Sequence, residues 1–253
     1  MRRNNTTSEE NNKLPVVTVV IPCHNHADMV CDAIDSVFAQ EDYRPINIVV
    51  VDDGSKDSPE KEIEKRFSSR KQEGVEITII RNESPLGPSA ARNIGIEKMW
   101  EKTDVFMMLD SDDLYLPGKI YKSVKKYLEY PENIGIVYTD AIIQNKIKGT
   151  KIYEHRVPFS REALEQECII SNTPLISKNA LASTGGYDPD MRTCEDWDLW
   201  LRITESFVAV HIPEALHVYS VTGKNSSDVV PKEVWQKNWS IIHQRIMSRR
   251  QKN

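Results

Sequence analysis

Hydrophobic and polar residues alternate along the first half of the chain in blocks that predict strands separated by helices. Between the strands, apolar residues recur at spacings of three and four, as at Val30, Ile34, Val37 and Phe38, which is typical of a helix with one buried face. This alternation predicts an α/β fold with a doubly wound, mostly parallel sheet and right-handed crossovers. The predicted strands are short apolar runs rich in Val and Ile, at residues 16–22, 46–51, 75–80, 105–109 and 134–139.

Turn-forming residues mark the ends of the predicted helices. Ser58 should cap the second helix, with Pro59 in its first turn, and Gly74 should end it. Ile63 and Phe67 fall on the face of this helix that we expect to be buried. Two further helices are predicted, one ending at about Trp100 and one covering residues 117–130.

The pattern becomes more irregular after Asp140, and we expect this smaller region to build the other wall of a site beside the sheet. A hairpin around Lys148 and Gly149 is predicted first. The chain should therefore comprise a disordered polar leader at 1–14, one domain at 15–228 and a C-terminal helix at 229–253. The other elements predicted after the hairpin are a helix at 160–167, strands at 173–177, 208–212 and 216–221, a helix from Cys194, and a helix at 231–249 with Trp235, Trp239, Ile242 and Ile246 near one face.

Composition favours a soluble globular protein, since 39% of the 253 residues are hydrophobic and 28% are charged. The net charge of −5 gives no reason to expect nucleic acid as a partner. No segment has the apolar length of a membrane span or of a signal peptide, so we predict a cytoplasmic protein. The basic segment 245–252 is more typical of a solvated helix end, although peripheral contact with the inner face of the cell membrane stays open. Cys23, Cys31, Cys168 and Cys194 form no CxxC pair and are predicted to be free thiols.

Three carboxylates, Asp110, Asp112 and Asp113, follow directly after the predicted strand at 105–109. Like charges at this spacing raise one another's pKa and resist burial unless they find a partner. Water, a cation, or capping of the next helix by Asp112 or Asp113 would each supply one. Hard oxygen ligands without His or Cys favour Mg²⁺ or Mn²⁺ over zinc. The carboxyl end of a strand in an open α/β sheet is also where ligands bind.

A second acidic pair, Glu195 and Asp196, opens a predicted helix. Negative charge in the first helical turn is favoured by the helix dipole, so the pair has a purely structural interpretation as well as a functional one. Arg92 likewise has two interpretations, as a residue of a functional site or as an ordinary ion-pair partner of an aspartate at the edge of the sheet.

Five stretches taken together resemble the family 2 glycosyltransferases, which are inverting enzymes of the GT-A fold. The resemblance covers roughly residues 16–225. It is specific because the motifs occur as an ordered set: Val19-Val-Ile-Pro22-Cys-His-Asn25, Val51-Asp52-Asp53-Gly54-Ser55-Lys56-Asp57, Gly87-Pro-Ser-Ala-Ala-Arg92-Asn93-Ile-Gly95, Leu109-Asp110-Ser-Asp112-Asp113 and Glu195-Asp196-Trp-Asp-Leu-Trp-Leu-Arg202.

The resemblance implies a metal-dependent, hexosyltransferase-like enzyme of polysaccharide or other glycoconjugate biosynthesis. Such an enzyme moves a sugar from a UDP-, dTDP- or GDP-linked donor to a hydroxyl of a glycan or lipid-linked acceptor. The smaller irregular region after Asp140 would form the acceptor side of its site. Asp196 matches the family's general base and Asp112 its ligand for Mn²⁺ or Mg²⁺, with Asp110 completing the DxD motif. Glu195 and Asp113 would support these residues. The positions that match the sugar-nucleotide site are Pro22, His24, Asn25, Asp53, Arg92, Asp110 and Ser111.

The chain departs from the family pattern at several points. His24 stands where an aromatic residue is common, and Ser220 and Thr222 stand where Arg and His often hold the diphosphate or the metal. Lys224 is a candidate for the missing positive charge. Absence of membrane helices and of a Gln-x-x-Arg-Trp motif favours single sugar additions over processive synthesis. Two alternatives remain: a catalytically silent GT-A domain that binds a sugar nucleotide or a partner protein, and a nucleotidyltransferase, whose glycine-rich loop is missing here.

Overall fold

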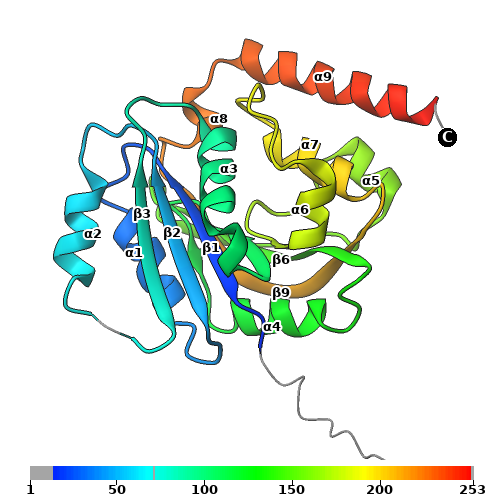
Figure 1. The fold of residues 1–253 in the computed structure, drawn as a ribbon. Helices are drawn as coiled ribbons and strands as arrows, with labels where there is room; N and C mark the ends of the chain where they lie inside the picture. Colours follow the sequence, from blue (N-terminus) through cyan, green and yellow to red (C-terminus); the bar gives the residue numbers. More distant parts are fainter. Residues whose placement is uncertain (1–13, 71, 252–253) are drawn as a thin grey trace, which may run out of the picture.

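The protein is built on one mixed β-sheet flanked by helices, as a computed structural model of residues 14–70 and 72–251 shows (Figure 1). The sheet order is β3-β2-β1-β4-β8-β6-β9-β5, and β7 pairs with β6 outside this path. The predicted leader falls almost entirely outside the described residues. The strands are β1 (Val17–Cys23), β2 (Ile46–Asp52), β3 (Val75–Arg81), β4 (Val105–Met108), β5 (Leu114–Tyr115), β6 (Ile134–Asn145), β7 (Thr150–Glu154), β8 (Leu175–Ser177) and β9 (Val208–Val221).

Helices pack on both faces of the parallel strands β3, β2, β1 and β4, as the sequence pattern predicts. Neighbouring residues of a strand point to opposite faces, so Val20 packs with one core and Val19 with the other. The core that contains Val20 includes residues of α3, and the core that contains Val19 includes residues of α1, α2 and α4. The helices are α1 (Val30–Phe38), α2 (Pro59–Phe67), α3 (Pro88–Met99), α4 (Lys119–Tyr127), α5 (Arg161–Gln166), α6 (Lys178–Thr184), α7 (Glu195–Ile203), α8 (Ser226–Val229) and α9 (Lys232–Arg250), with a 3-10 turn η1 (Trp100–Lys102).

α2 begins where the sequence predicts, but its cap and its end differ from the prediction. Ser58 does precede the helix, yet it adopts a left-handed conformation with φ 56° and its side chain makes no capping hydrogen bond. The helix ends at Phe67, well before Gly74. Ile63 and Phe67 are buried as predicted, and the polar residues that follow Phe67 have no apolar side chain to add to this core. Pro59 does occupy the first turn.

The second half of the sheet is antiparallel where β8 pairs with β4 and β6, and parallel where β6 pairs with β9. β9 is one continuous strand, whereas the sequence predicts two. The register with β6 shifts between Thr139 and Ala141, so that β9 carries extra residues around Pro213 and Glu214. A bulge accommodates a proline that cannot donate a ladder hydrogen bond, which explains why the sequence pattern is interrupted and the strand is not.

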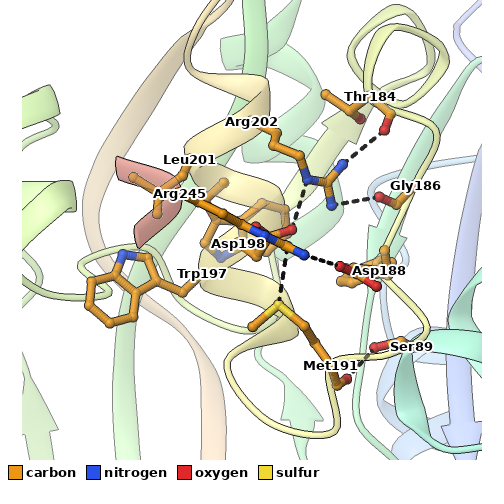
Figure 2. Close-up of polar contacts among 12 residues, drawn as sticks. Ser89, Thr184, Gly186, Asp188, Met191, Trp197, Asp198, Leu201, Arg202 and Arg245 are labelled. Atoms are coloured by element: carbon orange, nitrogen blue, oxygen red, sulfur yellow. Dashed lines mark hydrogen bonds and ion pairs between the residues drawn. The ribbon is translucent and has the colours of Figure 1, made fainter. Parts of the chain in front are cut away.

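The C-terminal helix α9 lies across the molecule and is held by an ion-pair cluster to α7 and to the segment before it (Figure 2). Arg245 donates to the buried carboxylate of Asp198 at 2.8 Å and to Asp188 at 2.6 Å. Asp198 also accepts from Arg202, its neighbour one turn along α7, at 2.8 Å. A fully buried carboxylate requires such partners because burial alone strongly disfavours its charge.

The apolar face of α9 differs from the prediction. Ile242 and Ile246 are buried together with Asn238, which donates to the carbonyl and hydroxyl oxygens of Thr193. Trp239 is 51% exposed, because the buried positions follow a spacing of four from Asn238. At the basic end of the helix, Arg249 pairs with Glu205, and Arg250 pairs with Glu165. Among the described residues, no helix has the length and apolar character needed to cross a bilayer.

Replacing Arg245 should loosen this attachment. We expect Arg245→Met to lower the free energy of unfolding by about 1–3 kcal/mol, because Asp198 stays buried with Arg202 as its remaining cationic partner. Urea denaturation checks this expectation. Arg250→Gln is the matched control, since it breaks a pair whose arginine is largely exposed and should cost less than about 1 kcal/mol. Equal effects of the two substitutions would contradict the assignment of Arg245 as the main attachment.

Candidate functional site

The three carboxylates after β4 lie together at the edge of the sheet, as the sequence predicts. Asp113 is 1% exposed and Asp112 is 8% exposed, while Asp110 is partly open to solvent. Neither Asp112 nor Asp113 caps the next helix, because α4 begins at Lys119 after Gly118 and has no side-chain cap. The capping interpretation is therefore wrong, and the cluster is stabilised by other partners.

Two asparagines that the sequence analysis missed hold these carboxylates. The amide nitrogen of Asn172 lies 2.9 Å from Asp110 Oδ2 and 2.9 Å from Asp113 Oδ2. Asn225 donates to Asp112 Oδ2 at 3.2 Å. Both asparagines lie in polar turns, where this residue type is common for local reasons alone, so no signal in the sequence marked them.

Burial and mutual repulsion raise the pKa values in the cluster. Burial, followed by the charge of Asp110, raises the pKa of Asp112 to about 6. Burial and the charges of Asp112 and Asp110 raise the pKa of Asp113 well above the usual value, against the backbone N–H of Ser220, which donates to it at 2.8 Å. Amide donors alone therefore leave the cluster with unfavourable negative charge, which a cation would relieve.

The carboxylates of the cluster are chemically suited to Mg²⁺ or Mn²⁺. Carboxylate oxygens are hard donors, and such cations are commonly held by one or two carboxylates together with substrate phosphates. The described residues contain no group of three His, Cys, Asp or Glu side chains placed to hold a metal by themselves. A cation here would accordingly take part of its coordination from a ligand.

Arg92 joins this cluster to the acidic pair of α7. Its guanidinium donates to Asp110 Oδ1 at 2.7 Å and to Glu195 Oε1 at 2.8 Å. The side chain is 7% exposed and lies over the ring of Tyr187, 5.3 Å from the ring centroid. Arg92 is thus more than a surface ion-pair partner, because it neutralises carboxylates from two different elements.

Asp196 lies in the first turn of α7, beside Glu195. One of its oxygens accepts from the backbone N–H of Trp197 at 2.7 Å. Burial and the charge of Glu195 raise the pKa of Asp196 to about 6, although Trp197 N–H and Arg92 act in the opposite direction. The acidic pair therefore does occupy a helix start, and Arg92 also connects it to the edge of the sheet.

The predicted nucleotide-side residues gather at the ends of β1 and β2. His24 Nδ1 lies 2.7 Å from the backbone carbonyl oxygen of Asp53, and His24 Nε2 lies 2.8 Å from the side-chain amide nitrogen of Asn25. Asn25 accepts from the backbone N–H of Lys56 at 2.9 Å. Pro22 precedes them on β1, opposite Val51 of β2. These contacts fix the two strand ends to each other.

The carboxylate of Asp53 holds the loop that leads into α3. It accepts from the backbone N–H groups of Leu86 at 2.9 Å and Gly87 at 2.8 Å, and from the side chain of Asn82 at 2.8 Å. The sequence analysis did not anticipate this structural role. Asp53 Oδ2 takes only the Gly87 bond, so it keeps capacity for another donor.

A histidine that the sequence analysis missed connects the two groups. His26 Nδ1 lies 2.8 Å from the hydroxyl of Ser111, the residue between Asp110 and Asp112. Burial lowers the pKa of His26, which favours the neutral ring. The β1–α1 loop is thereby fixed against the acidic cluster, which Arg92 in turn connects to Glu195 on α7.

The chain is similar in sequence to known glycosyltransferases. The family model described as glycosyl transferase family 2 matches residues 18–181. An uncharacterized glycosyltransferase of Rickettsia typhi is 30% identical over 202 residues, which cover 77% of this chain and 60% of the relative. The chain thus spans about three fifths of that relative's length.

Solved structures share the fold. TarS of S. aureus in complex with UDP-GlcNAc has a TM-score of 0.66 at 15% identity, covering 85% of this chain and 61% of that one. The mannosyltransferase PcManGT of Pyrobaculum calidifontis, in complex with GDP-Man and Mn²⁺, has a TM-score of 0.65 at 18% identity, covering 85% and 59%. The predicted α/β architecture of the GT-A type is confirmed by these neighbours.

Stability should depend on pH through Asp112. Because its folded-state pKa is raised to about 6, the folded protein gains a proton on this group as the pH falls from about 7.5 to about 5, whereas an unfolded aspartate stays ionised. Wild type gains about 1 kcal/mol of unfolding free energy from this uptake, and Asp112→Asn gains none.

We therefore expect the stability of Asp112→Asn relative to wild type to be about 1 kcal/mol greater near pH 7.5 than near pH 5. Urea unfolding in the presence of EDTA measures this difference without bound cations. Asp190→Asn, at an exposed aspartate, reports the effect of net charge alone. A difference between Asp112→Asn and wild type that does not change with pH would contradict the raised pKa.

Proposed function

Because the chain belongs to glycosyl transferase family 2, we propose that it is an inverting enzyme that transfers a sugar from a nucleotide diphosphosugar to an acceptor hydroxyl, in polysaccharide or other glycoconjugate biosynthesis. The observation that carries the proposal is Arg92, which bonds Asp110 on one side and Glu195 on the other. This bridge connects two parts of the site. On one side are Asp110 and Asp112, which are suited to bind the sugar nucleotide and its cation, and on the other is Asp196, which is suited to act as the base.

The nucleotide would bind along the ends of β1 and β2, against Pro22, His24 and Asn25. Asp53 Oδ2 has the acceptor capacity to take a ring N–H of the base, which uracil, thymine and guanine all offer. The two structural neighbours are complexes with UDP-GlcNAc and GDP-Man, so UDP-, dTDP- and GDP-linked donors all remain candidates. Asp110 and Ser111 would lie beside the ribose.

Asp112 would hold Mg²⁺ or Mn²⁺ together with the donor diphosphate, and Asp113 would support it from the buried side. The cation supplies Lewis-acid stabilisation of the charge that develops on the leaving diphosphate. The raised pKa of Asp112 supports this assignment. It means that the negative charge of this carboxylate is unfavourable without a partner, and a nearby cation would stabilise the ionised form. The Mn²⁺ complex of the mannosyltransferase neighbour is a further support.

Asp196 would accept the proton of the acceptor hydroxyl as its oxygen attacks the anomeric carbon. One carbon–oxygen bond forms, the bond from that carbon to the diphosphate breaks, and the nucleotide diphosphate leaves with the bonding electron pair. Attack from the face opposite the leaving group inverts the configuration. A carboxylate with a pKa near 6 is a stronger base than an ordinary aspartate and is still ionised at neutral pH.

The altered segment at the end of β9, residues 219–227, would serve the site in a different way from the family pattern. Ser220 contributes its backbone N–H to Asp113, and Thr222 donates through its N–H and its hydroxyl to Asn225, the residue that holds Asp112. Lys224 lies 3.7 Å from Asp28 in a weak, exposed pair, from which it could move to the diphosphate. The same alteration favours the alternative of a catalytically silent domain that binds sugar nucleotides or a partner protein.

Substitution of Asp196 separates the enzyme from the silent domain. With the sugar nucleotide that binds most tightly, Asp196→Asn should reduce turnover on the order of 10²–10⁴-fold and leave the donor Kd unchanged. In wild type, kcat should rise with pH up to about 6 and then level off, because the base must be deprotonated. Isothermal titration calorimetry and a nucleotide-release assay measure these quantities.

Asp190→Asn is the matched control for this experiment, because Asp190 is exposed and lies in the segment just before α7. It should keep the turnover of wild type. Full activity of Asp196→Asn would exclude Asp196 as the base, and an equal loss of donor affinity would show that the residue binds the donor instead.

A further inference from the structure

The hairpin of β6 and β7 has a basic tip. Residues 141–153 include Lys146, Lys148 and Lys151 and contain no Asp or Glu, although the whole chain has a net charge of −5. All three lysines are exposed. Lysine ion pairs in the described part of the chain are formed by Lys65, Lys122, Lys126 and Lys224, so none of the three lysines of the tip is held in one.

The same tip exposes large apolar side chains. Ile147 is 67% exposed and Ile152 is 62% exposed, and they are the two isoleucines among the exposed large hydrophobic residues of the described chain. β7 pairs with β6 and with no other strand of the described residues. Lysines alone would protect its free edge from pairing with another chain. Exposed isoleucines give no such protection. The tip therefore presents basic and apolar side chains together, which edge protection does not explain.

Hydrogen bonds fix the tip in place. Asn145 Oδ1 accepts from the backbone N–H groups of Ile147 at 3.0 Å and Lys148 at 2.8 Å. Lys146 N–H donates to the carbonyl of Val221 on β9 at 2.9 Å. The lysines and isoleucines are therefore presented on a rigid turn, which lowers the entropy that binding would cost.

The tip also lies beside the acidic cluster. A Cβ atom added to Gly223 would lie 3.1 Å from Ile147 Cδ1, so Ile147 contacts the segment whose Asn225 holds Asp112. Whatever binds the tip is thus brought to the edge of the candidate site.

We propose that this hairpin tip, residues 145–153, is a contact surface for an anionic lipid bilayer. Lysine ammonium groups would pair with headgroup phosphates, and Ile147 and Ile152 would enter the interface between headgroups and acyl chains. The basic end of α9 is less suited to this contact, because Arg249 and Arg250 already pair with Glu205 and Glu165.

Membrane contact at the tip would place the site edge against the bilayer, which suits an acceptor attached to a lipid. This consequence for the acceptor rests on the proposed function. The contact itself does not, so failure of the vesicle experiment and failure of the Asp196 experiment are distinguishable.

Sedimentation of the full chain with lipid vesicles tests the contact. Wild type should bind vesicles of phosphatidylcholine with phosphatidylglycerol, should bind phosphatidylcholine alone much more weakly, and should lose affinity as salt increases. Lys146→Gln/Lys148→Gln/Lys151→Gln should lower the partition coefficient on the order of 100-fold, since each lysine near the surface contributes roughly fivefold. Ile147→Ser/Ile152→Ser should lower binding as well, including the part that persists at high salt.

The matched control is Lys61→Gln/Lys65→Gln/Lys125→Gln, which removes the same charge from exposed positions on α2 and α4. It should bind as wild type does, and thermal melting should show that every variant is folded. Lack of binding by wild type, an equal loss in the control, or a loss with Arg250→Gln but not with the hairpin variants would each overturn the proposal. Binding to a soluble polyanion in place of vesicles, unaffected by Ile147→Ser/Ile152→Ser, would also overturn it.

Discussion

The candidate site depends on one interaction, the double ion pair of Arg92 with Asp110 and Glu195. A guanidinium this well buried is stable only when its charge is matched and its donors are satisfied. Arg92 comes from α3, Asp110 follows β4, and Glu195 opens α7. The bridge therefore sets the distance between the edge of the sheet and the first turn of α7, and with it the position of Asp196.

Negative charge beyond this bridge is left incompletely balanced. Asn172 and Asn225 satisfy oxygens of Asp110, Asp112 and Asp113 without neutralising them, and the raised pKa of Asp112 is the electrostatic consequence. A fold that needed only stability would more readily bury apolar side chains at this edge. Retaining three adjacent carboxylates is better explained by a ligand that brings positive charge.

Most of the sheet could be predicted from the sequence, because strands buried on both faces have a strong apolar pattern, as in β1, β2 and β4. The errors arose where local signals conflict with tertiary structure. Pro213 suggested the end of a strand that a bulge allows to continue, and Trp239 suggested a buried position that Asn238 occupies instead. The acidic cluster after β4 could be singled out because three carboxylates follow an apolar strand, and the other candidate site residues come from the family resemblance. Asn172, Asn225 and the loop-holding bonds of Asp53 depend on contacts between distant segments, which the sequence pattern does not mark.

Calorimetric titration with a panel of UDP-, dTDP- and GDP-sugars, in Mn²⁺ and in EDTA, tests most directly whether the acidic cluster is a donor and cation site. The account predicts that one class of donor binds to wild type in Mn²⁺, binds much more weakly in EDTA, and is not bound by Asp112→Ala. Binding of that donor with equal affinity in EDTA or to folded Asp112→Ala, or binding of none, would contradict it.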